Sequence, residues 1–177
     1  MKKTLIIVAH PRLTESVVNQ HWVNELKKYP DKFTIHEIYK EYPDSKINYL
    51  KEQLLISKHE NLILQFPIYW FNCPPLLKQW LDEVFTYGWA FGGTGNSLKN
   101  KKIMLAVSTG SKLNDYSNDG KYKSSLSQIL YPFELLVSYV QANYQPIHAF
   151  YGTENTPSLE DLNKNAIEYS KKILDII

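Results

Sequence analysis

The stretch that decides the fold covers residues 5–30 and reads LIIVAHPRLTESVVNQHWVNELKKYP. Its first five residues are apolar at every position and mostly β-branched, which is typical of a parallel strand buried on both faces. After a loop that begins with His-Pro, apolar residues between Val18 and Leu26 recur at helical spacing, and Pro30 ends the segment. The stretch therefore predicts a strand, a loop and a helix, in that order.

This alternation of strand and helix continues to the end of the chain. Further strands are expected at residues 33–38, 62–66, 103–107 and 145–151, and further helices at 47–56, at 74–85, at 125–140 with an irregularity at Pro132, and from Ser158 onward. Repeated strand–helix units require right-handed crossovers onto a parallel sheet. We therefore expect one α/β domain over residues 1–177, with a doubly wound parallel sheet of five strands and helices on both of its faces.

The composition excludes several classes of protein. The 177 residues include 20 Lys and Arg against 18 Asp and Glu, and the resulting net charge of +2 is too small for a nucleic-acid footprint or a polybasic membrane anchor. The longest apolar runs, such as residues 5–9, are far shorter than the roughly 18 to 20 residues that span a bilayer. Cys73 is the single cysteine, so we expect neither a disulfide within the chain nor a metal site, and a cytoplasmic location.

Three loops are expected to carry the function. In an open parallel sheet, ligands bind beyond the carboxyl ends of the strands, near the point where the strand order reverses. The loops that follow such strands are residues 10–19, 67–73 and 108–120, and we call them the first, second and third loops. They hold a large share of the chain's proline, aromatic and hydroxyl residues.

The first loop reads HPRLTESVVN. A helix N-terminus offers unpaired N–H groups and a partial positive charge, so Ser16, Asn19 and nearby amides, helped by His10, could hold a phosphate. Alternatively, Ser16 only caps its helix and His10 is an ordinary loop residue. The phosphate loop GxxxxGK[ST] and the dinucleotide fingerprint GxGxxG are both absent from the chain, which argues against the corresponding nucleotide-binding classes.

The second and third loops suggest a flat ligand. Proline and the consecutive aromatic residues Tyr69, Trp70 and Phe71 could form a stiff wall along a conjugated ring, although such residues are often core or oligomer contacts instead. The Ser-Thr-Gly turn that starts at Ser108 lets backbone N–H groups approach a ligand edge and stabilise an anion that forms during reduction. Tyr116 is a nearby hydroxyl donor, unless it merely lies on a flexible surface loop.

Taken together, the motifs resemble a known family. HPxxxxSxxN at residues 10–19, FPIYWFNCPPLLKQWLDEVFTYGWAFG at 66–92 and STG at 108–110 are similar to the flavodoxin-like NAD(P)H dehydrogenase (quinone) family. Within that family the chain resembles the small bacterial members that include the ancillary quinone reductases of glutathione-regulated potassium-efflux systems. The resemblance spans nearly the whole chain, and PPLLKxWLDxVFxxGWAFG is its most specific part.

The resemblance implies a flavodoxin-like fold, a tightly bound flavin, and a homodimer whose active sites lie at the subunit interface. FMN is favoured over FAD because the chain lacks the extension that larger members use around adenine. NAD(P)H would donate a hydride to the flavin, and a quinone would take up two electrons. The implied flavin contacts are His10, Ser16, Val17, Val18 and Asn19 for the phosphate and ribityl chain, Pro67, Ile68, Tyr69, Trp70 and Phe71 beside the isoalloxazine, and Ser108, Thr109, Gly110 and Ser111 at its pyrimidine edge.

The resemblance also implies a catalytic role for Tyr116, which matches an active-site tyrosine of the larger animal members. Two departures put proton delivery by the animal route in doubt: the family often has TTGG where this chain has Ser108-Thr109-Gly110-Ser111, and Tyr122 replaces the histidine that follows the tyrosine. We also expect a loop with Trp89, Phe91 and the glycines of residues 92–95 to lie beside the site.

Two other functions remain open. A flavodoxin-type electron carrier would bind FMN without turning over NAD(P)H, but such carriers are usually acidic. A regulatory subunit would mainly bind a potassium-efflux transporter in the membrane. The sequence also leaves open the choice between NADH and NADPH and the identity of the acceptor, since quinones, azo dyes and nitroaromatics could all meet a reduced flavin.

Overall fold

The computed structural model of the chain describes residues 4–176 and contains one sheet of five parallel strands. The order across the sheet is β2-β1-β3-β4-β5. This confirms the predicted fold class. The strands are β1 (Thr4–Val8), β2 (Phe33–Glu37), β3 (Asn61–Pro67), β4 (Lys102–Thr109) and β5 (Asn143–Tyr151).

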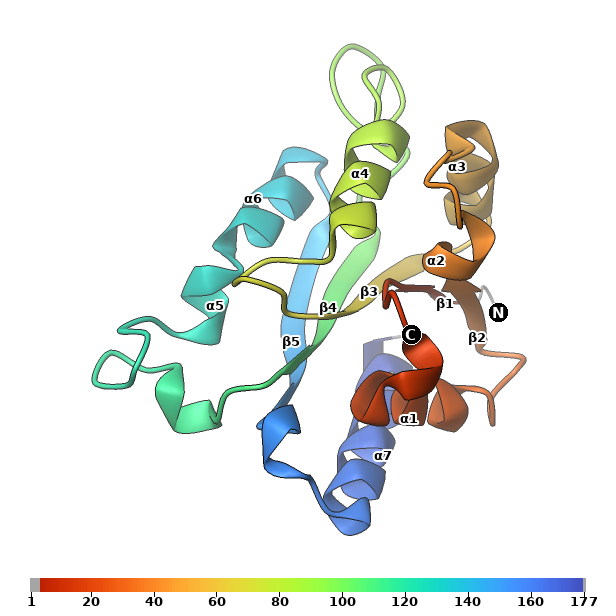
Figure 1. Cartoon of the computed structure of the whole chain (residues 1–177). Coiled ribbons are helices and arrows are strands. Elements are labelled where there is room, and N and C mark those ends of the chain that lie inside the picture. Colours follow the sequence, from red (N-terminus) through yellow and green to blue (C-terminus); the bar gives the residue numbers. More distant parts are fainter. Residues whose placement is uncertain (1–3, 177) are drawn as a thin grey trace.

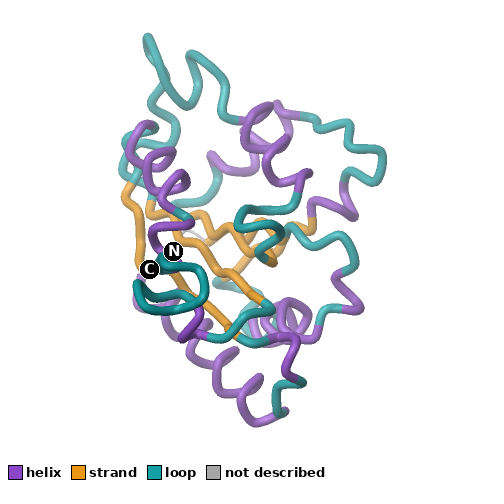
Figure 2. Tube along the Cα trace, turned by 60° about the vertical axis from the view of Figure 1, so that its left-hand side comes forward, coloured by secondary structure: helices purple, strands orange, loops and turns teal. Residues whose placement is uncertain are grey.

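Helices cover both faces of the sheet, and Figures 1 and 2 show the strands running between them. The helices α1 (Val17–Leu26) and α7 (Leu159–Ile176) pack together on one face. The other face carries α3 (Tyr49–Ser57), α4 (Pro75–Val84), α5 (Leu126–Ile129) and α6 (Tyr131–Tyr139). A one-turn helix, α2 (Ile38–Glu41), directly follows β2.

The continuously apolar strands are buried on both sides because successive side chains of a strand point to opposite faces. Leu5 and Ile7 of β1 belong to the core under α3 to α6, whereas Ile6 and Val8 belong to the core under α1 and α7. No helix among residues 4–176 is long and apolar enough to cross a membrane.

Proline sets the helix boundaries. Pro74 is the N-cap of α4 and Pro75 its first residue, as expected from proline's missing N–H. The helix expected at 125–140 is interrupted at Leu130, two residues before Pro132, which lies in the first turn of α6. The short α2 was not predicted, since one helical turn leaves almost no periodic signal.

The segment between α4 and β4 was expected beside the site, but it lies at the opposite edge of the sheet from the three loops. Helix α4 starts at the carboxyl end of β3 and returns to the edge where β4 begins, so residues 85–101 lie at the amino-terminal edge of the sheet (Figure 1). The expectation that Trp89, Phe91 and the glycines at 92–95 border the site of their own chain is therefore wrong. Their composition suggested a ligand loop, but a crossover helix carries the chain to the opposite edge.

Candidate functional site

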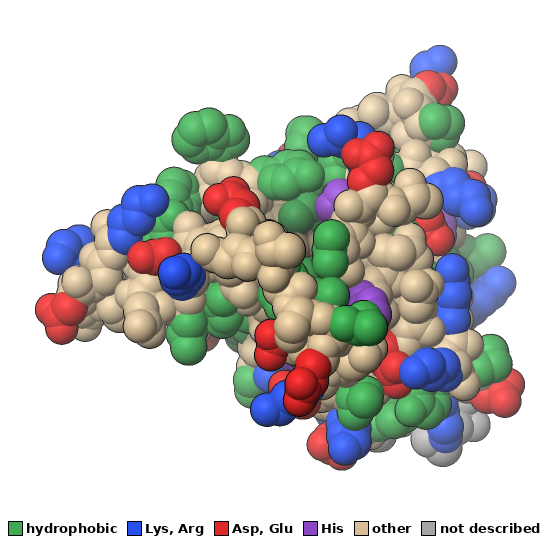
Figure 3. All heavy atoms as spheres, turned by 60° about the horizontal axis from the view of Figure 1, so that its bottom comes forward, with side chains coloured by type: hydrophobic (Ala, Val, Ile, Leu, Met, Phe, Trp, Pro, Cys, Tyr) green, Lys and Arg blue, Asp and Glu red, His purple; other side chains and the backbone are tan. Residues whose placement is uncertain are grey.

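The three loops meet at the carboxyl edge of the sheet. Strands β1, β3 and β4 are neighbours, and the strand order reverses between β1 and β3. The backbone N–H of Ile68 donates to the carbonyl of Ser108 over 2.8 Å, which ties the second loop to the third. Figure 3 views the molecule from this end, where basic and acidic side chains are interspersed around hydrophobic and histidine side chains without a patch of one charge sign.

In the first loop, α1 begins at the site. Ser16 is the N-cap, and its Oγ accepts the backbone N–H of Asn19 over 3.1 Å. Val17 and Val18 are the first two residues of the helix, and their N–H groups have no carbonyl partner within it. Ser16 thus caps its helix, and the helix end it caps still offers free donors and a positive dipole end to an anion.

His10 offers a further donor. Its Nδ1 accepts the backbone N–H of Arg12 over 3.1 Å, so the neutral ring carries its proton on Nε2. Burial, reinforced by the nearby Arg12 charge, lowers the pKa of His10 below its usual value. Near neutral pH the imidazole is therefore an uncharged hydrogen-bond donor.

The second loop presents an aromatic turn. Tyr69 and Asn72 exchange backbone hydrogen bonds of 2.8 and 3.0 Å, and Trp70 and Phe71 between them have φ angles of 48° and 62°. The side chains of Tyr69, Trp70 and Phe71 are 40%, 94% and 45% exposed, so the alternative that they are core residues is wrong. Left-handed conformations of non-glycine residues are strained and cluster at functional sites.

The third loop is packed by tyrosines. Tyr116 is 7% exposed, its hydroxyl is hydrogen-bonded to that of Thr109, and its ring lies 5.0 Å from that of Tyr122. It is therefore not a tyrosine on a flexible surface loop. Burial raises its pKa, so the hydroxyl is protonated at neutral pH. The ring of Phe71 meets that of Tyr122 edge-on at 5.0 Å, a second link between the second and third loops.

The predicted site residues all lie on these three loops, at different depths. Exposed side chains belong to Val17, Tyr69, Trp70 and Phe71; half-buried positions are His10, Ser16, Ile68, Gly110 and Ser111; and buried side chains belong to Val18, Asn19, Pro67, Ser108, Thr109 and Tyr116. The buried group supports the surface on which a ligand would rest.

A fourth loop follows the edge strand β5 and was not predicted, because it is not next to the point where the strand order reverses. The backbone N–H of Gly152 donates to the carbonyl of Ser111 over 2.8 Å. A Cβ on Gly110 would lie 2.5 Å from a carboxylate oxygen of Glu154, so the Glu154 side chain of the fourth loop lies directly against the Ser-Thr-Gly turn. Gly152 has a φ of 77°, and a glycine directly after the predicted fifth strand was the sequence signal available for this turn.

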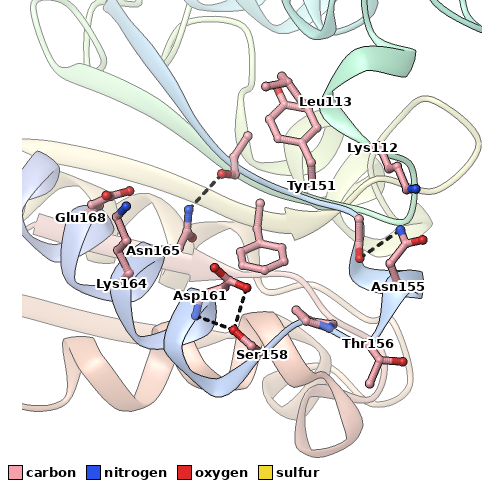
Figure 4. A pocket seen from close by; sticks show the side chains of 14 residues that line it. Lys112, Leu113, Tyr151, Asn155, Thr156, Ser158, Asp161, Lys164, Asn165 and Glu168 are labelled. Atoms are coloured by element: carbon pink, nitrogen blue, oxygen red, sulfur yellow. Dashed lines mark hydrogen bonds between the residues drawn. The ribbon is translucent and has the colours of Figure 1, made fainter.

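A cavity of about 710 Å³ opens between this fourth loop and α7. Figure 4 shows Lys112, Tyr151, Asn155 and Lys164 around it, with Asn155 donating to a backbone carbonyl of the same loop. Residues 4–176 contain no group of three or more His, Cys, Asp or Glu side chains that could share a metal ion. The described residues therefore offer free N–H donors at a helix end and a flat aromatic wall beside them.

Comparisons with known proteins agree with this arrangement. A family model described as flavodoxin-like fold matches residues 2–173. General stress protein 14 of Bacillus subtilis is 44% identical over 164 residues, which cover 93% of each chain. The B. subtilis protein named uncharacterized NAD(P)H oxidoreductase YrkL is 42% identical over 172 residues, covering 96% of this chain and 98% of that protein. The potassium-efflux ancillary protein KefG of Cronobacter sakazakii is 34% identical over 98% of this chain and 93% of its own length.

Solved structures are also similar. General stress protein 14 of Treponema denticola, crystallised in complex with FMN, has a TM-score of 0.91 and 48% identity, with 96% of each chain covered. An NADPH-quinone reductase from P. pentosaceus has a TM-score of 0.84 and 28% identity, again over 96% of each chain. By its family model, its relatives and the arrangement of its sheet, the chain belongs to the family of proteins with the flavodoxin-like fold.

Proposed function

We propose that this protein is an FMN-dependent NAD(P)H:quinone oxidoreductase. The observation that carries the proposal is that the anion site at the start of α1, the aromatic turn of residues 69–72 and the Ser-Thr-Gly turn lie together where the strand order reverses. A relative with 48% identity has been crystallised with FMN, and another is named as an NAD(P)H oxidoreductase.

The residues present fit FMN, which joins a phosphate to a flat ring system. The free N–H groups of Val17 and Val18 and the neutral His10 suit the phosphate, which needs donors and a positive dipole end. The aromatic turn suits one side of the ring system, and the Ser-Thr-Gly turn, which the Ile68 N–H joins to the second loop, suits its polar edge. FAD remains the less favoured flavin.

FMN, when bound, supplies the redox chemistry: it takes a hydride from NAD(P)H and returns two electrons to an acceptor. The chain's residues bind and orient it. Backbone donors at Thr109 and Gly110 would stabilise the negative charge that reduction places on the ring, and the protonated Tyr116 hydroxyl holds the Thr109 hydroxyl in place. In this mechanism Tyr116 holds the Thr109 hydroxyl in position and so helps to stabilise the negative charge on the reduced ring.

The experiment that tests the proposal is an anaerobic spectral titration. Purified protein is saturated with FMN, NADH or NADPH is added stepwise, and a benzoquinone is then supplied. Bleaching of the bound-flavin band, followed by its return with the quinone, is the expected result, and the comparison of the two nucleotides identifies the donor. Replacing the quinone by an azo dye or a nitroaromatic ranks the acceptors. Absence of flavin binding would refute the proposal, and bound flavin that neither nucleotide bleaches would favour an electron carrier.

We also propose that the protein is a cytoplasmic homodimer. An exposed apolar face on α6 is formed by Tyr131, Leu135 and Tyr139, which are 50%, 52% and 67% exposed and spaced four residues apart. The ring of Phe91, from the segment after α4, lies 5.4 Å from that of Tyr139 and extends this face. We expect a second copy of the chain to cover it.

A second candidate function rests on the similarity to KefG. That protein is named as an ancillary protein of a potassium-efflux system, and 34% identity over nearly the full length makes a comparable membrane-transporter partner a reasonable alternative. Co-purification with a membrane transporter from the native host would support it. The flavin titration would still report whether oxidoreductase activity accompanies that role.

A further inference from the structure

The central strand β3 contains a glutamine within its run of apolar residues. Residues 62–66 read LILQF, and Gln65 is fully buried between its register partners Val8 of β1 and Ala106 of β4. A buried amide is strongly unfavourable unless its donors and acceptor find partners. Residues 62–66 were predicted only as a strand, although a lone polar residue in an apolar run is itself a signal.

The partners of Gln65 come from both helices on one face of the sheet. Its Nε2 donates to the backbone carbonyl of Asn19 in α1 over 3.1 Å and lies 3.4 Å from the Oδ1 of the same residue. Its Oε1 accepts the hydroxyl of Tyr169 in α7 over 3.3 Å. Tyr169 is itself fully buried, and burial raises its pKa well above its usual value, so it stays a donor.

Asn19 carries the connection on to the site. It is fully buried, and its Nδ2 donates to the hydroxyl of Ser108 over 2.9 Å and to that of Ser16 over 3.3 Å. Ser16 caps α1 and Ser108 lies at the end of β4, so Asn19 bridges the first and third loops. No buried side-chain nitrogen or oxygen within the described part of the chain lacks a hydrogen-bond partner, so every buried polar group of this network has at least one.

We propose that Gln65 and Tyr169 are positioning residues for the cofactor, which act through Asn19 to fix the start of α1 relative to the end of β4. This proposal rests on the proposed function. The start of α1 would hold the phosphate of FMN and the end of β4 would meet its ring, so the network sets the distance between the two ends of the ligand site. A site held at this spacing before binding loses less free energy in ordering its loops.

The network also explains why Asn19 is buried. The resemblance to the quinone reductases implied that Asn19 contacts the flavin, but its amide nitrogen is directed at Ser16 and Ser108 and its carbonyl groups are directed at Gln65. The Asn19 side chain therefore supports the site from the protein interior. Ser16 and the N–H groups of Val17 and Val18 form the surface that faces the phosphate.

The test compares three variants. Gln65→Leu removes both links and keeps a similar volume, and Tyr169→Phe removes only the Tyr169 hydroxyl. Ile63→Ala is the matched control, because Ile63 lies two residues before Gln65 in β3, faces the same helices and is 1% exposed, but belongs to no part of the network. Each apoprotein is titrated with FMN by flavin fluorescence quenching, its melting temperature is measured, and the absorption spectrum of the saturated protein is recorded.

We expect Gln65→Leu to weaken FMN binding roughly tenfold and Tyr169→Phe roughly threefold, in line with the modest net value of each hydrogen bond. Gln65→Leu should also shift the absorption band of bound FMN. Ile63→Ala should lower the melting temperature at least as much, yet leave FMN affinity within twofold and the spectrum unchanged.

Two results would overturn the inference while leaving the proposed function intact. The first is FMN affinity within twofold of wild type in both network variants. The second is a loss of affinity in Ile63→Ala that matches the loss in Gln65→Leu, since affinity would then follow overall stability. If Gln65→Leu does not fold, Tyr169→Phe decides alone. Failure of the wild-type protein to bind FMN would instead refute the proposed function.

Discussion

At the scale of single residues, the aromatic turn of the second loop is rigid for local reasons. Trp70 and Phe71 are both in the left-handed region, which costs about 1–2 kcal/mol for a residue with a Cβ. The turn is closed by two backbone bonds between Tyr69 and Asn72, and the Asn72 side chain accepts the N–H of Cys73 over 2.8 Å. Pro74 follows at once and limits the chain further. The exposed wall therefore keeps its shape without a ligand.

Tyr116 gives the sharpest residue-scale prediction. Tyr116→Phe removes the hydroxyl that is bonded to Thr109, so we expect flavin reduction by NAD(P)H to slow by about tenfold, equivalent to about 1.4 kcal/mol of transition-state stabilisation. Because burial raises the pKa of Tyr116, the wild-type rate should show no Tyr116 ionisation between pH 6 and 9. Stopped-flow absorbance under anaerobic conditions measures the rate.

Tyr151→Phe is the control for this experiment. The ring of Tyr151 lies 5.6 Å from that of Tyr116 in the same aromatic cluster, so the control removes a neighbouring hydroxyl and preserves the packing. We expect it to reduce flavin at the wild-type rate. An unchanged rate in Tyr116→Phe would remove Tyr116 from the mechanism.

At the scale of elements, the sequence specifies strands better than it specifies connections. Continuous apolar runs identified the buried strands β1, β3 and β4, because only a strand covered on both faces needs such a run. The one-turn α2 and the true position of residues 85–101 were missed, since neither follows from periodicity. The three site loops were found from strand ends and turn residues. The network at Gln65 was not, because its other members lie on α1, α7 and β4, far apart in the sequence.

A buried carboxylate joins α3, α4, β2 and the residue that follows α2. Glu52 of α3 is fully buried and accepts hydrogen bonds from Trp80 Nε1 in α4 over 2.8 Å, Tyr42 beyond α2 over 2.6 Å and His36 in β2 over 2.9 Å. Burial opposes its ionisation, but the bonds from His36, Tyr42 and Trp80 outweigh burial and lower its pKa. The ionised carboxylate therefore stabilises the contact of α3 and α4 with the sheet edge.

Glu52→Gln should lower the free energy of unfolding by about 2–4 kcal/mol at pH 7, because a buried acceptor of three bonds becomes partly a donor. A carboxyl whose pKa is lowered by folding contributes stability above its unfolded pKa of about 4.3 and loses it as the pH falls through the folded value. The difference between wild type and variant should thus be largest above about pH 5 and shrink below it. Urea unfolding followed by circular dichroism across this range measures the difference.

Glu25→Gln is the matched control for Glu52→Gln. Glu25 is also buried, at 7% exposure, but its partner Lys28 lies at the surface. The distance from Lys28 Nζ to Glu25 Oε2 is 2.5 Å. We expect this control to change the unfolding free energy by less than about 1 kcal/mol. Equal losses in the two variants would contradict the role assigned to the Glu52 cluster.

At the scale of the whole molecule, residues 85–101 and the α6 face both indicate a surface that a second copy of the chain covers. Residues 85–101 lie at the edge of the sheet opposite the site loops, yet Tyr87 within them is 74% exposed and Phe91 packs against Tyr139 of α6. Exposed aromatic side chains that continue from one element to the next mark interaction surfaces. A two-fold symmetric pair would bury the same face on both copies.

Leu135→Asp tests this pairing. Leu135 lies in the middle of the α6 face and is 52% exposed, so burying a charge there on both copies should abolish a dimer that the wild type forms at micromolar concentration. Leu54→Asp on α3 is the control, because Leu54 is 59% exposed but belongs to a helix that α4 separates from α6 (Figure 1), and this variant should remain a dimer. Light scattering coupled to size-exclusion chromatography gives the mass of each. Monomeric wild type, or a dimer that survives Leu135→Asp, would show that the α6 face is not the contact between copies.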